Sequence, residues 1–162
     1  MVDLDFFKKY NDRFGHQAGN VMLRQIGEVL RTSCRETDQV FRYGGDEFAL
    51  LLPETGRAGA RTVAEKIQAA VQSVDGELLS PTPLTCSIGI AVFPKDGSDS
   101  QSIILAADRA CYAGKRAGRA RIATAVEGLA LAGEFQPTAP TPIENPRPAT
   151  ASTQRVTSYS AA

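Results

Sequence analysis

Apolar residues recur at helical spacing in three stretches of the chain. In residues 20–33, Met22, Ile26, Val29 and Leu30 fall on one face at positions i, i+4, i+7 and i+8. Residues 57–74 and 99–117 show the same spacing. Their expected inward residues are Ala60, Val63, Ala64, Ile67, Val71 and Val74 in the first stretch, and Ile103, Ile104, Ala107, Ala110 and Cys111 in the second. The pattern predicts three amphipathic helices.

Shorter apolar runs between these helices predict strands. Residues 1–4 have the pattern of the end of a buried strand, and residues 40–43 and 48–52 flank a Gly-rich turn that predicts a β-hairpin. Residues 85–93 predict a further strand, in which Gly89 allows a close backbone approach. The order strand, helix, hairpin, helix, strand, helix predicts an α+β fold with helices packed on a sheet.

The composition changes near Ile122. Residues 123–162 hold more than half of the nine prolines, among Ala, Thr and Ser. Such a segment buries too little apolar surface to offset its backbone entropy, so we expect a disordered tail, with a brief helical turn near Val126 as the alternative. The expected domain therefore covers residues 1–122. Because it opens inside a strand, we expect it to lack its N-terminal segment.

Charge and cysteine content narrow the classes of protein. The chain has 18 basic and 18 acidic residues, and this net charge of zero argues against binding nucleic acid through charge alone. We find no apolar run of ~18 residues and no secretory-signal pattern, so neither a membrane span nor secretion is expected of this chain. The three cysteines are scattered and lack CxxC spacing. This favours a reducing cytoplasm over a zinc site or a disulfide framework.

Acidic residues gather at two expected ends of secondary structure. On a strand, Asp3 and Asp5 share a face while Leu4 points into the core. Asp46–Glu47 lies in the hairpin turn, where Gly44–Gly45 is expected to adopt positive φ and to let a ligand approach. If the two strands are neighbours, the carboxylates of Asp3 and Asp46 converge, and their oxygens are the ligands that Mg²⁺ prefers. The alternative is an ordinary turn whose acids face water.

Basic residues supply two candidate anion sites. Phe6, Phe7 and Lys8 come next along the chain, where backbone N–H groups can form an anion-binding nest with Lys8 as the counter-charge. The alternative, which we prefer for the two phenylalanine side chains, is a helix start that packs into the core. Lys115 and Arg119, spaced i, i+4 at the last predicted helix, form a second cationic pair. A solvated helix face is the alternative there.

Several short motifs follow one another along residues 1–122, namely Asp3–Lys8, Asn11–Asp12, Gly15–His16, Arg42–Phe48, Ser87–Gly89, Ala107–Asp108 and Tyr112–Arg119. Their order and spacing resemble those of the GGDEF domain, so the chain resembles a bacterial diguanylate cyclase. The resemblance implies a palm-like fold related to class III nucleotidyl cyclases, with a central antiparallel sheet and packed helices. It also implies condensation of two GTP to cyclic di-GMP and two pyrophosphates, with Mg²⁺ or Mn²⁺, in a homodimer whose protomers each hold one GTP.

The resemblance also implies roles for particular residues. Asp3, the Leu4 carbonyl and Asp46 would bind the metal. Glu47 would assist metal binding or deprotonate the 3′-hydroxyl that attacks the α-phosphate, and Asn11 would hydrogen-bond guanine. The residues expected along the β- and γ-phosphates are Phe6, Phe7, Lys8, Lys115 and Arg119.

Arg35 and Asp38 match the Arg-x-x-Asp motif that inhibits the family's members by binding their product. The resemblance implies that they bind cyclic di-GMP, and arginine suits this because its planar fork pairs with phosphate and with guanine edges. An exposed turn between a helix and a strand is the alternative.

Two departures from the family pattern bear on activity. Asn20 stands where the family usually has an Asp that contacts guanine, and an amide offers one acceptor where a carboxylate offers two. Asn20 is also expected to be the N-cap of the helix over 20–33. The family's opening helix is missing, so apolar sheet surface is expected to be exposed. These departures motivate a second hypothesis, a catalytically weak or inactive module that binds GTP or cyclic di-GMP.

Overall fold

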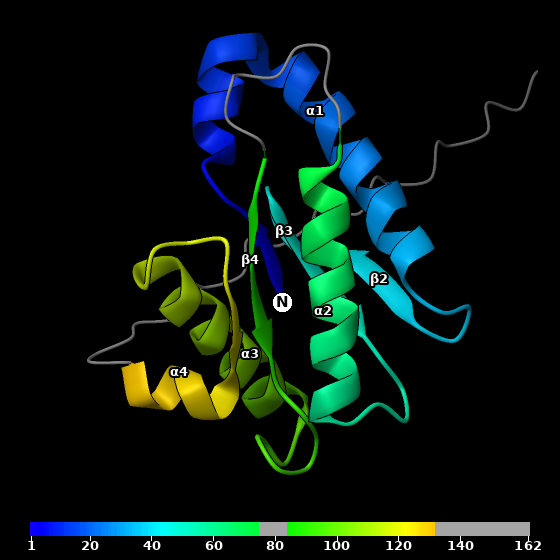
Figure 1. Cartoon of the computed structure of the whole chain (residues 1–162), viewed down its shortest axis with the longest axis vertical. Coiled ribbons are helices and arrows are strands. Elements are labelled where there is room, and N and C mark those ends of the chain that lie inside the picture. Colours follow the sequence, from blue (N-terminus) through cyan, green and yellow to red (C-terminus); the bar gives the residue numbers. More distant parts are fainter. Residues whose placement is uncertain (75–83, 132–162) are drawn as a thin grey trace, which may run out of the picture.

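The computed structural model describes residues 1–74 and 84–131 of the chain (Figure 1). The predicted order of elements is confirmed, with one strand and one helix added at the C-terminal side. The elements are β1 Val2–Leu4, α1 Phe7–Ser33, β2 Gln39–Arg42, β3 Glu47–Leu51, α2 Arg57–Gln72, β4 Cys86–Ile90, α3 Ser100–Arg116, β5 Ile122–Thr124 and α4 Ala125–Leu131.

The strands form one five-stranded sheet in the order β2-β3-β1-β4-β5. The expectation of an antiparallel sheet needs one correction, because β4 and β5 run parallel while every other pair is antiparallel. The short strand β1 lies in the middle, with Asp3 opposite Glu47 on one side and Ser87 on the other. A three-residue strand holds this central place because both neighbours pair with it and all three of its residues are buried.

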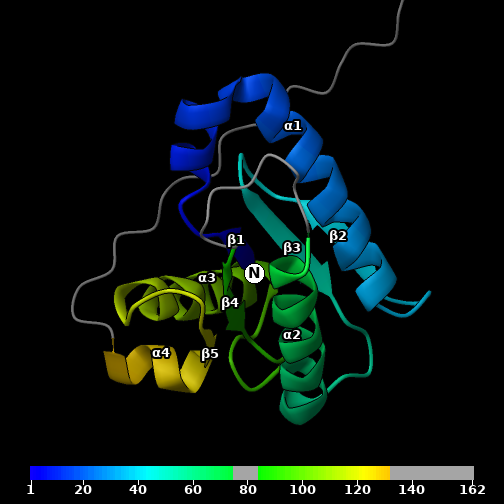
Figure 2. The same ribbon diagram turned by 45° about the horizontal axis from the view of Figure 1, so that its top comes forward.

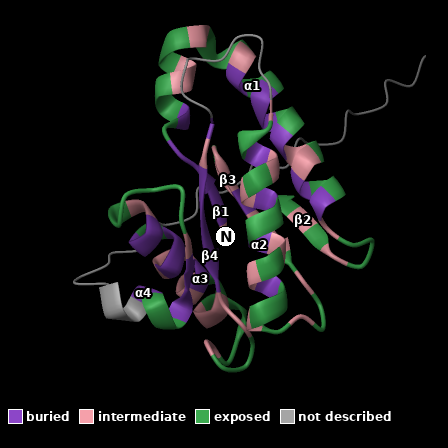
Figure 3. Ribbon diagram, viewed as in Figure 1, coloured by how far each residue is buried: buried purple, intermediate pink, exposed green. Residues whose placement is uncertain are grey.

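Helices cover both faces of the sheet (Figures 1 and 2). Helices α1 and α2 lie on one face and α3 and α4 on the other. Figure 3 shows the buried residues running along the strands and the inner faces of the helices. The largest fully buried side chains include Leu4 of β1, Ile26 and Leu30 of α1, and Ile67 and Val71 of α2. The predicted apolar stripes of these two helices therefore form the core.

Helix α3 packs closely on β4. A Cβ on Gly89 would lie 1.9 Å from the carbonyl oxygen of Ala107 and 2.4 Å from the amide nitrogen of Cys111, so the predicted close approach at this glycine is confirmed. Ala107 and Cys111 are buried as predicted, whereas Ile104 is 39% exposed, because it lies on the solvent side of the helix. The placement of Ile104 in the inward stripe was therefore wrong.

Helix α1 begins earlier than the predicted stretch over 20–33. It starts at Phe7 and is interrupted at Gly15, whose φ of 83° and ψ of 160° are not helical. The predicted helix is thus the second half of a longer element. Asn20 lies inside that half and is exposed, so its expected role as an N-cap is wrong.

Strand β5 and helix α4 lie beyond the expected domain boundary at residue 122. Ala123, Thr124 and Ala125 are buried, and β5 pairs with β4 along Ile122–Thr124. Strand β5 was not expected, because small buried residues in a three-residue strand carry little apolar signal, whereas α4 lies where a brief helical turn near Val126 was the alternative. The remainder of the predicted tail, from residue 132, lies outside the described residues.

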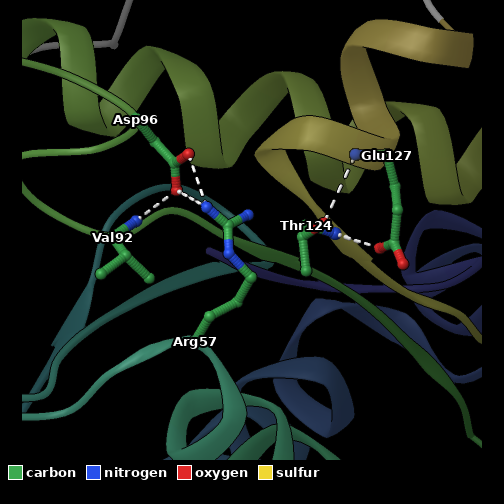
Figure 4. A network of polar contacts seen from close by, with 5 residues as sticks. All are labelled: Arg57, Val92, Asp96, Thr124 and Glu127. Atoms are coloured by element: carbon green, nitrogen blue, oxygen red, sulfur yellow. Dashed lines mark hydrogen bonds and ion pairs between the residues drawn. The ribbon is translucent and has the colours of Figure 1, made fainter.

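Polar contacts hold the C-terminal elements and the segment before α3 in place, and Figure 4 shows those around Asp96 and between Thr124 and Glu127. The Thr124 amide donates to the Glu127 carboxylate at 2.7 Å, which begins α4, and Arg61 of α2 pairs with Glu127 at 3.0 Å. Asp96 accepts from the Val92 amide at 2.7 Å and from the Arg57 guanidinium at 2.8 Å. Within the ranges described, no helix has the length and apolar character needed to cross a bilayer.

Candidate functional site

The two acidic stretches meet at one end of the sheet, as expected if their strands are neighbours. β1 and β3 pair directly, which puts Asp3 opposite Glu47. Just beyond this pair, the Leu4 amide donates a hydrogen bond of 3.1 Å to the carbonyl of Asp46. The fold therefore brings together all four residues predicted to lie around a metal ion.

The hairpin tip that carries Asp46 and Glu47 is held by backbone and guanidinium contacts. The Arg42 guanidinium donates to the carbonyls of Gly44 at 3.2 Å and Gly45 at 2.7 Å. Neither glycine has a positive φ, so that expectation was wrong. A Cβ on Gly44 would lie 2.5 Å from Oε2 of Glu47, so this carboxylate would have to shift, whereas a Cβ on Gly45 would meet open space.

The carboxylates of this site lie in an environment that disfavours their charges. Burial raises the pKa of Asp3 from 3.8 to about 7, with repulsion from Asp46 and Glu47 adding to the shift and attraction to Lys115 opposing it. Burial also raises the pKa of Glu47, helped by the negative charges of Asp108 and Asp46. A cation that joins these acids would offset the burial of Asp3 and the repulsion among the three carboxylates.

The donor set fits a divalent cation. Oδ1 of Asp3 is buried and has no hydrogen-bond partner among the described residues. Within those residues no three His, Cys, Asp or Glu side chains cluster around one point, so a cation here would also need oxygens from the backbone or from a bound ligand. Mg²⁺ is commonly held in this way, by one or two carboxylates together with phosphate and water.

Lys115 supplies the positive charge beside these acids. Its ammonium pairs with Oδ2 of Asp3, and although burial lowers the pKa of Lys115, the hydrogen bond and charge of Asp3 raise it above its ordinary value. The lysine is thus partly buried in the site, and the alternative of a solvated helix face does not hold for it. Helix α3 ends at Arg116, so Arg119 lies in the following loop and not on the helix as expected.

Arg119 nevertheless reaches the start of α1. Its guanidinium lies 4.6 Å from the ring centroid of Phe6, and the Lys9 ammonium lies 4.7 Å from the same ring. Phe6 is 52% exposed and has a left-handed backbone, so its expected place in the core was wrong. Phe7 is buried as predicted, and Lys8 is exposed. The structure therefore gathers most of the residues predicted along the phosphates.

Asn11 and Asn20 lie on the two halves of α1, on either side of the interruption at Gly15. Oδ1 of Asn11 is buried without a hydrogen-bond partner among the described residues, and a Cβ on Gly19 would come within 1.8 Å of it. Asn20 is exposed and lines an open groove of about 1170 Å³ between α1 and β2.

Arg35 and Asp38 line the same groove as Asn20. They form a turn in which the Arg35 amide donates to Oδ2 of Asp38 at 2.8 Å and the Asp38 amide donates to the Arg35 carbonyl at 3.1 Å. This is the exposed turn weighed as the alternative, and it leaves the arginine side chain exposed at the mouth of the groove. The motif therefore lies on a different part of the surface from the acidic site.

Two acids near the site had no role in the sequence-based prediction. Asp108 is half-buried on α3 and affects the pKa of Glu47; the Ala107–Asp108 motif was noticed, but no role was assigned to this acid. Asp5 is buried and accepts hydrogen bonds from Thr85, Ser87 and Ala120. Its alternation with Asp3 was noticed, but its partners lie too far along the chain to be read from the pattern.

Comparison with known proteins adds independent information. Residues 1–121 match the profile of a family described as "Diguanylate cyclase, GGDEF domain". Diguanylate cyclase A of Treponema denticola is 35% identical over 133 residues, which are 80% of this chain and 35% of that protein. Diguanylate cyclase DgcP of Pseudomonas aeruginosa is 39% identical over 127 residues, which are 77% of this chain and 19% of that protein. The chain thus spans only a part of these relatives.

Solved structures show the same fold. The GGDEF domain of YfiN from Pseudomonas aeruginosa superposes with a TM-score of 0.70 at 38% identity, covering 76% of this chain and 78% of that one. The GGDEF domain of DgcB from Caulobacter crescentus, solved in complex with c-di-GMP, gives a TM-score of 0.70 at 33% identity, covering 77% of this chain and 75% of that one.

Proposed function

Because the chain belongs to the GGDEF domain family of diguanylate cyclases, we propose that it condenses two molecules of GTP to cyclic di-GMP and two pyrophosphates. The observation that carries the proposal is the meeting of Asp3, Asp46 and Glu47 beside Lys115, with Arg119 and Phe6 next along the same edge. The carboxylates can bind a divalent metal ion, and the side chains of Lys115 and Arg119 can bind phosphate. Together they make a site for a metal-bound nucleoside triphosphate.

Asp3, the carbonyl of Leu4, Asp46 and Glu47 are the groups that would hold Mg²⁺ or Mn²⁺. The unpartnered Oδ1 of Asp3 and the raised pKa of Glu47 support this assignment. When bound, such an ion neutralises phosphate charge and lowers the pKa of a hydroxyl near it.

The chain's own residues then have distinct tasks. Glu47 is placed to accept the proton of the 3′-hydroxyl, because its raised pKa makes the carboxylate a better base than a free Glu. Lys115, Arg119 and Lys8 bind the triphosphate and offset the charge that develops on the leaving pyrophosphate. Asn11 would hydrogen-bond guanine, as the resemblance to the family implies, and its buried Oδ1 has no other partner among the described residues.

The reaction needs two active sites facing each other. In each half-reaction the 3′-oxygen of one GTP forms a bond to the α-phosphorus of the other, and the bond from that phosphorus to the β-phosphate oxygen breaks. Two such transfers close the ring and release two pyrophosphates. One chain holds one GTP, so we propose a homodimer as the active form, with product binding at Arg35 and Asp38 as the inhibitory contact.

A second candidate function is binding of GTP or cyclic di-GMP without turnover. Asn20 favours it, since an exposed amide replaces the carboxylate that the family usually has there. A charged hydrogen bond contributes roughly 1.5–3 kcal/mol, so this replacement would weaken GTP binding on the order of tenfold to a hundredfold.

The decisive experiment incubates the chain with GTP and Mg²⁺ and measures cyclic di-GMP by chromatography and pyrophosphate by a coupled assay. The proposal expects both products in a ratio of one to two, and expects Asp46→Asn to abolish them. Glu65→Gln, at an exposed position on α2, is the matched control and should be fully active. Calorimetry that detects GTP or cyclic di-GMP binding without any product would favour the second function instead.

A further inference from the structure

The loop after α3 has an unusual backbone. Gly118, Arg119 and Ala120 have φ values of 118°, 63° and 48°, so three successive residues lie on the left-handed side. Only glycine adopts this conformation without cost, because a Cβ comes close to the following carbonyl oxygen. Arg119 and Ala120 therefore need outside contacts to keep this shape.

Asp5 supplies the contact at the end of that loop. The Ala120 amide donates to Oδ2 of Asp5 at 3.0 Å, and the hydroxyls of Thr85 and Ser87 donate to the same carboxylate at 2.8 and 2.9 Å. Asp5 is only 3% exposed. The carboxylate thus ties the end of β1, the start of β4 and the loop to one point in the interior.

The tied segments carry the two halves of the proposed phosphate site. Asp5 is followed immediately by Phe6 and two residues later by Lys8, whereas the loop carries Arg119 and follows the turn of α3 that carries Lys115. Arg119 is held over the Phe6 ring at 4.6 Å, and its own amide donates to the carbonyl of Gly114 at 3.1 Å. The positions of the two halves relative to each other therefore depend on the bond from Ala120 to Asp5.

We propose that Asp5 is a positioning residue for triphosphate binding, which acts through the left-handed loop at 118–120 and takes no part in metal binding. This inference rests on the proposed function, because it assumes that Phe6, Lys115 and Arg119 contact GTP. It assigns the second acid of the Asp3-Leu4-Asp5 sequence a task different from that of the first.

The test measures the dissociation constant of 3′-deoxy-GTP, which lacks the attacking hydroxyl, in the presence of Mg²⁺. Asp5→Ala is expected to weaken binding at least about tenfold, and Asp5→Asn, which keeps one acceptor oxygen, about threefold. Asp96→Ala is the matched control. Asp96 is also a buried acid that accepts from a backbone amide, but its partners Val92 and Arg57 belong to other parts of the fold (Figure 4).

Two further readouts separate positioning from general stability. Hydrogen exchange at the Ala120 amide is expected to accelerate in the Asp5 variants and not in Asp96→Ala. Adding Ala120→Gly to either Asp5 variant is expected to recover part of the affinity, because glycine adopts the left-handed conformation without help. If Asp5→Ala does not fold, Asp5→Asn carries the same comparison.

The inference is overturned if the folded Asp5 variants bind 3′-deoxy-GTP as tightly as the wild type. Equal weakening by Asp96→Ala, or no recovery with Ala120→Gly, would also overturn it, since either result assigns Asp5 a purely structural role. A wild-type chain that does not bind 3′-deoxy-GTP removes the proposed function itself, and that outcome is seen before any variant is made.

Discussion

Replacing Asp3 with asparagine is expected to stabilise the metal-free protein at neutral and alkaline pH. Asp3 is buried, and its pKa rises from 3.8 in the free residue to about 7 in the fold. Between these two values the native chain keeps a proton on Asp3 that the unfolded chain has released, so the free energy of unfolding falls as pH rises through this range. Asparagine has the shape of the protonated acid and cannot ionise.

The magnitude follows from the shift. A difference of about three pKa units corresponds to about 4 kcal/mol, which is the full gain for Asp3→Asn once pH is above 7. The attraction to Lys115 lowers the pKa of Asp3, so the loss of this attraction in Asp3→Asn is already included in the free energy derived from the shift. Solvent reaches part of the site and screens the charge of Asp3, so we expect Asp3→Asn to raise the free energy of unfolding by ~2–4 kcal/mol.

Urea denaturation at about pH 5 and about pH 8, without metal, measures the effect. The stability advantage of Asp3→Asn over the wild type should widen by about 2 kcal/mol between these pH values. Excess Mg²⁺ should then stabilise the wild type and leave the variant unchanged, since a ligand stabilises only the state that binds it. Asp96→Asn, which weakens the contact with Arg57, is the control and should be destabilising at both pH values. Parallel pH curves for the wild type and Asp3→Asn would refute the reasoning.

Three further predictions concern single groups. Gly89→Ala should destabilise the fold by about 3 kcal/mol or more in thermal melts, because the added Cβ would lie 1.9 Å from the Ala107 carbonyl oxygen. Gly45→Ala is the control and should change the stability little, because its Cβ would meet open space. Asn20→Asp should tighten GTP binding about tenfold in calorimetry if residue 20 contacts guanine; no change would exclude that contact. Asp3 must ionise to bind a cation, so the affinity for Mn²⁺ should fall about tenfold for each pH unit below the raised pKa of Asp3 and should be constant above it. Electron spin resonance of Mn²⁺ measures this affinity. An affinity independent of pH would contradict the assignment of Asp3 as a metal ligand.

Much of the fold follows from local sequence pattern. The helices α2 and α3 were placed within two residues at each end, because their aliphatic stripes are long and regular. For the first half of α1 only a helix start at the two phenylalanines was expected, and its extent was not predicted, since its stripe is aromatic and Gly15 interrupts it. Strand β5 was missed because its three residues form a strand only through pairing with β4.

The parts of the site that lie within short sequence motifs could be predicted, and the parts that depend on residues far apart in the chain could not. The acids at the β1 end and the hairpin tip are visible as sequence motifs, and their convergence needed only that the two strands be neighbours. The conformation of the loop at 118–120 was not visible, because its Ala120 amide bonds to Asp5, more than a hundred positions away. Gly44 was singled out for backbone freedom, but its φ is not positive, and a Cβ there would instead meet the carboxylate of Glu47.

The central place of β1 has a consequence for synthesis of the chain. This strand is synthesised before its partners β3 and β4 and before the Ala120 amide that binds Asp5. Such distant pairings make folding slow and leave early segments exposed while they wait. A nascent chain must therefore contain all residues from β1 to Ala120 before Asp3 and Asp5 can both reach their native partners.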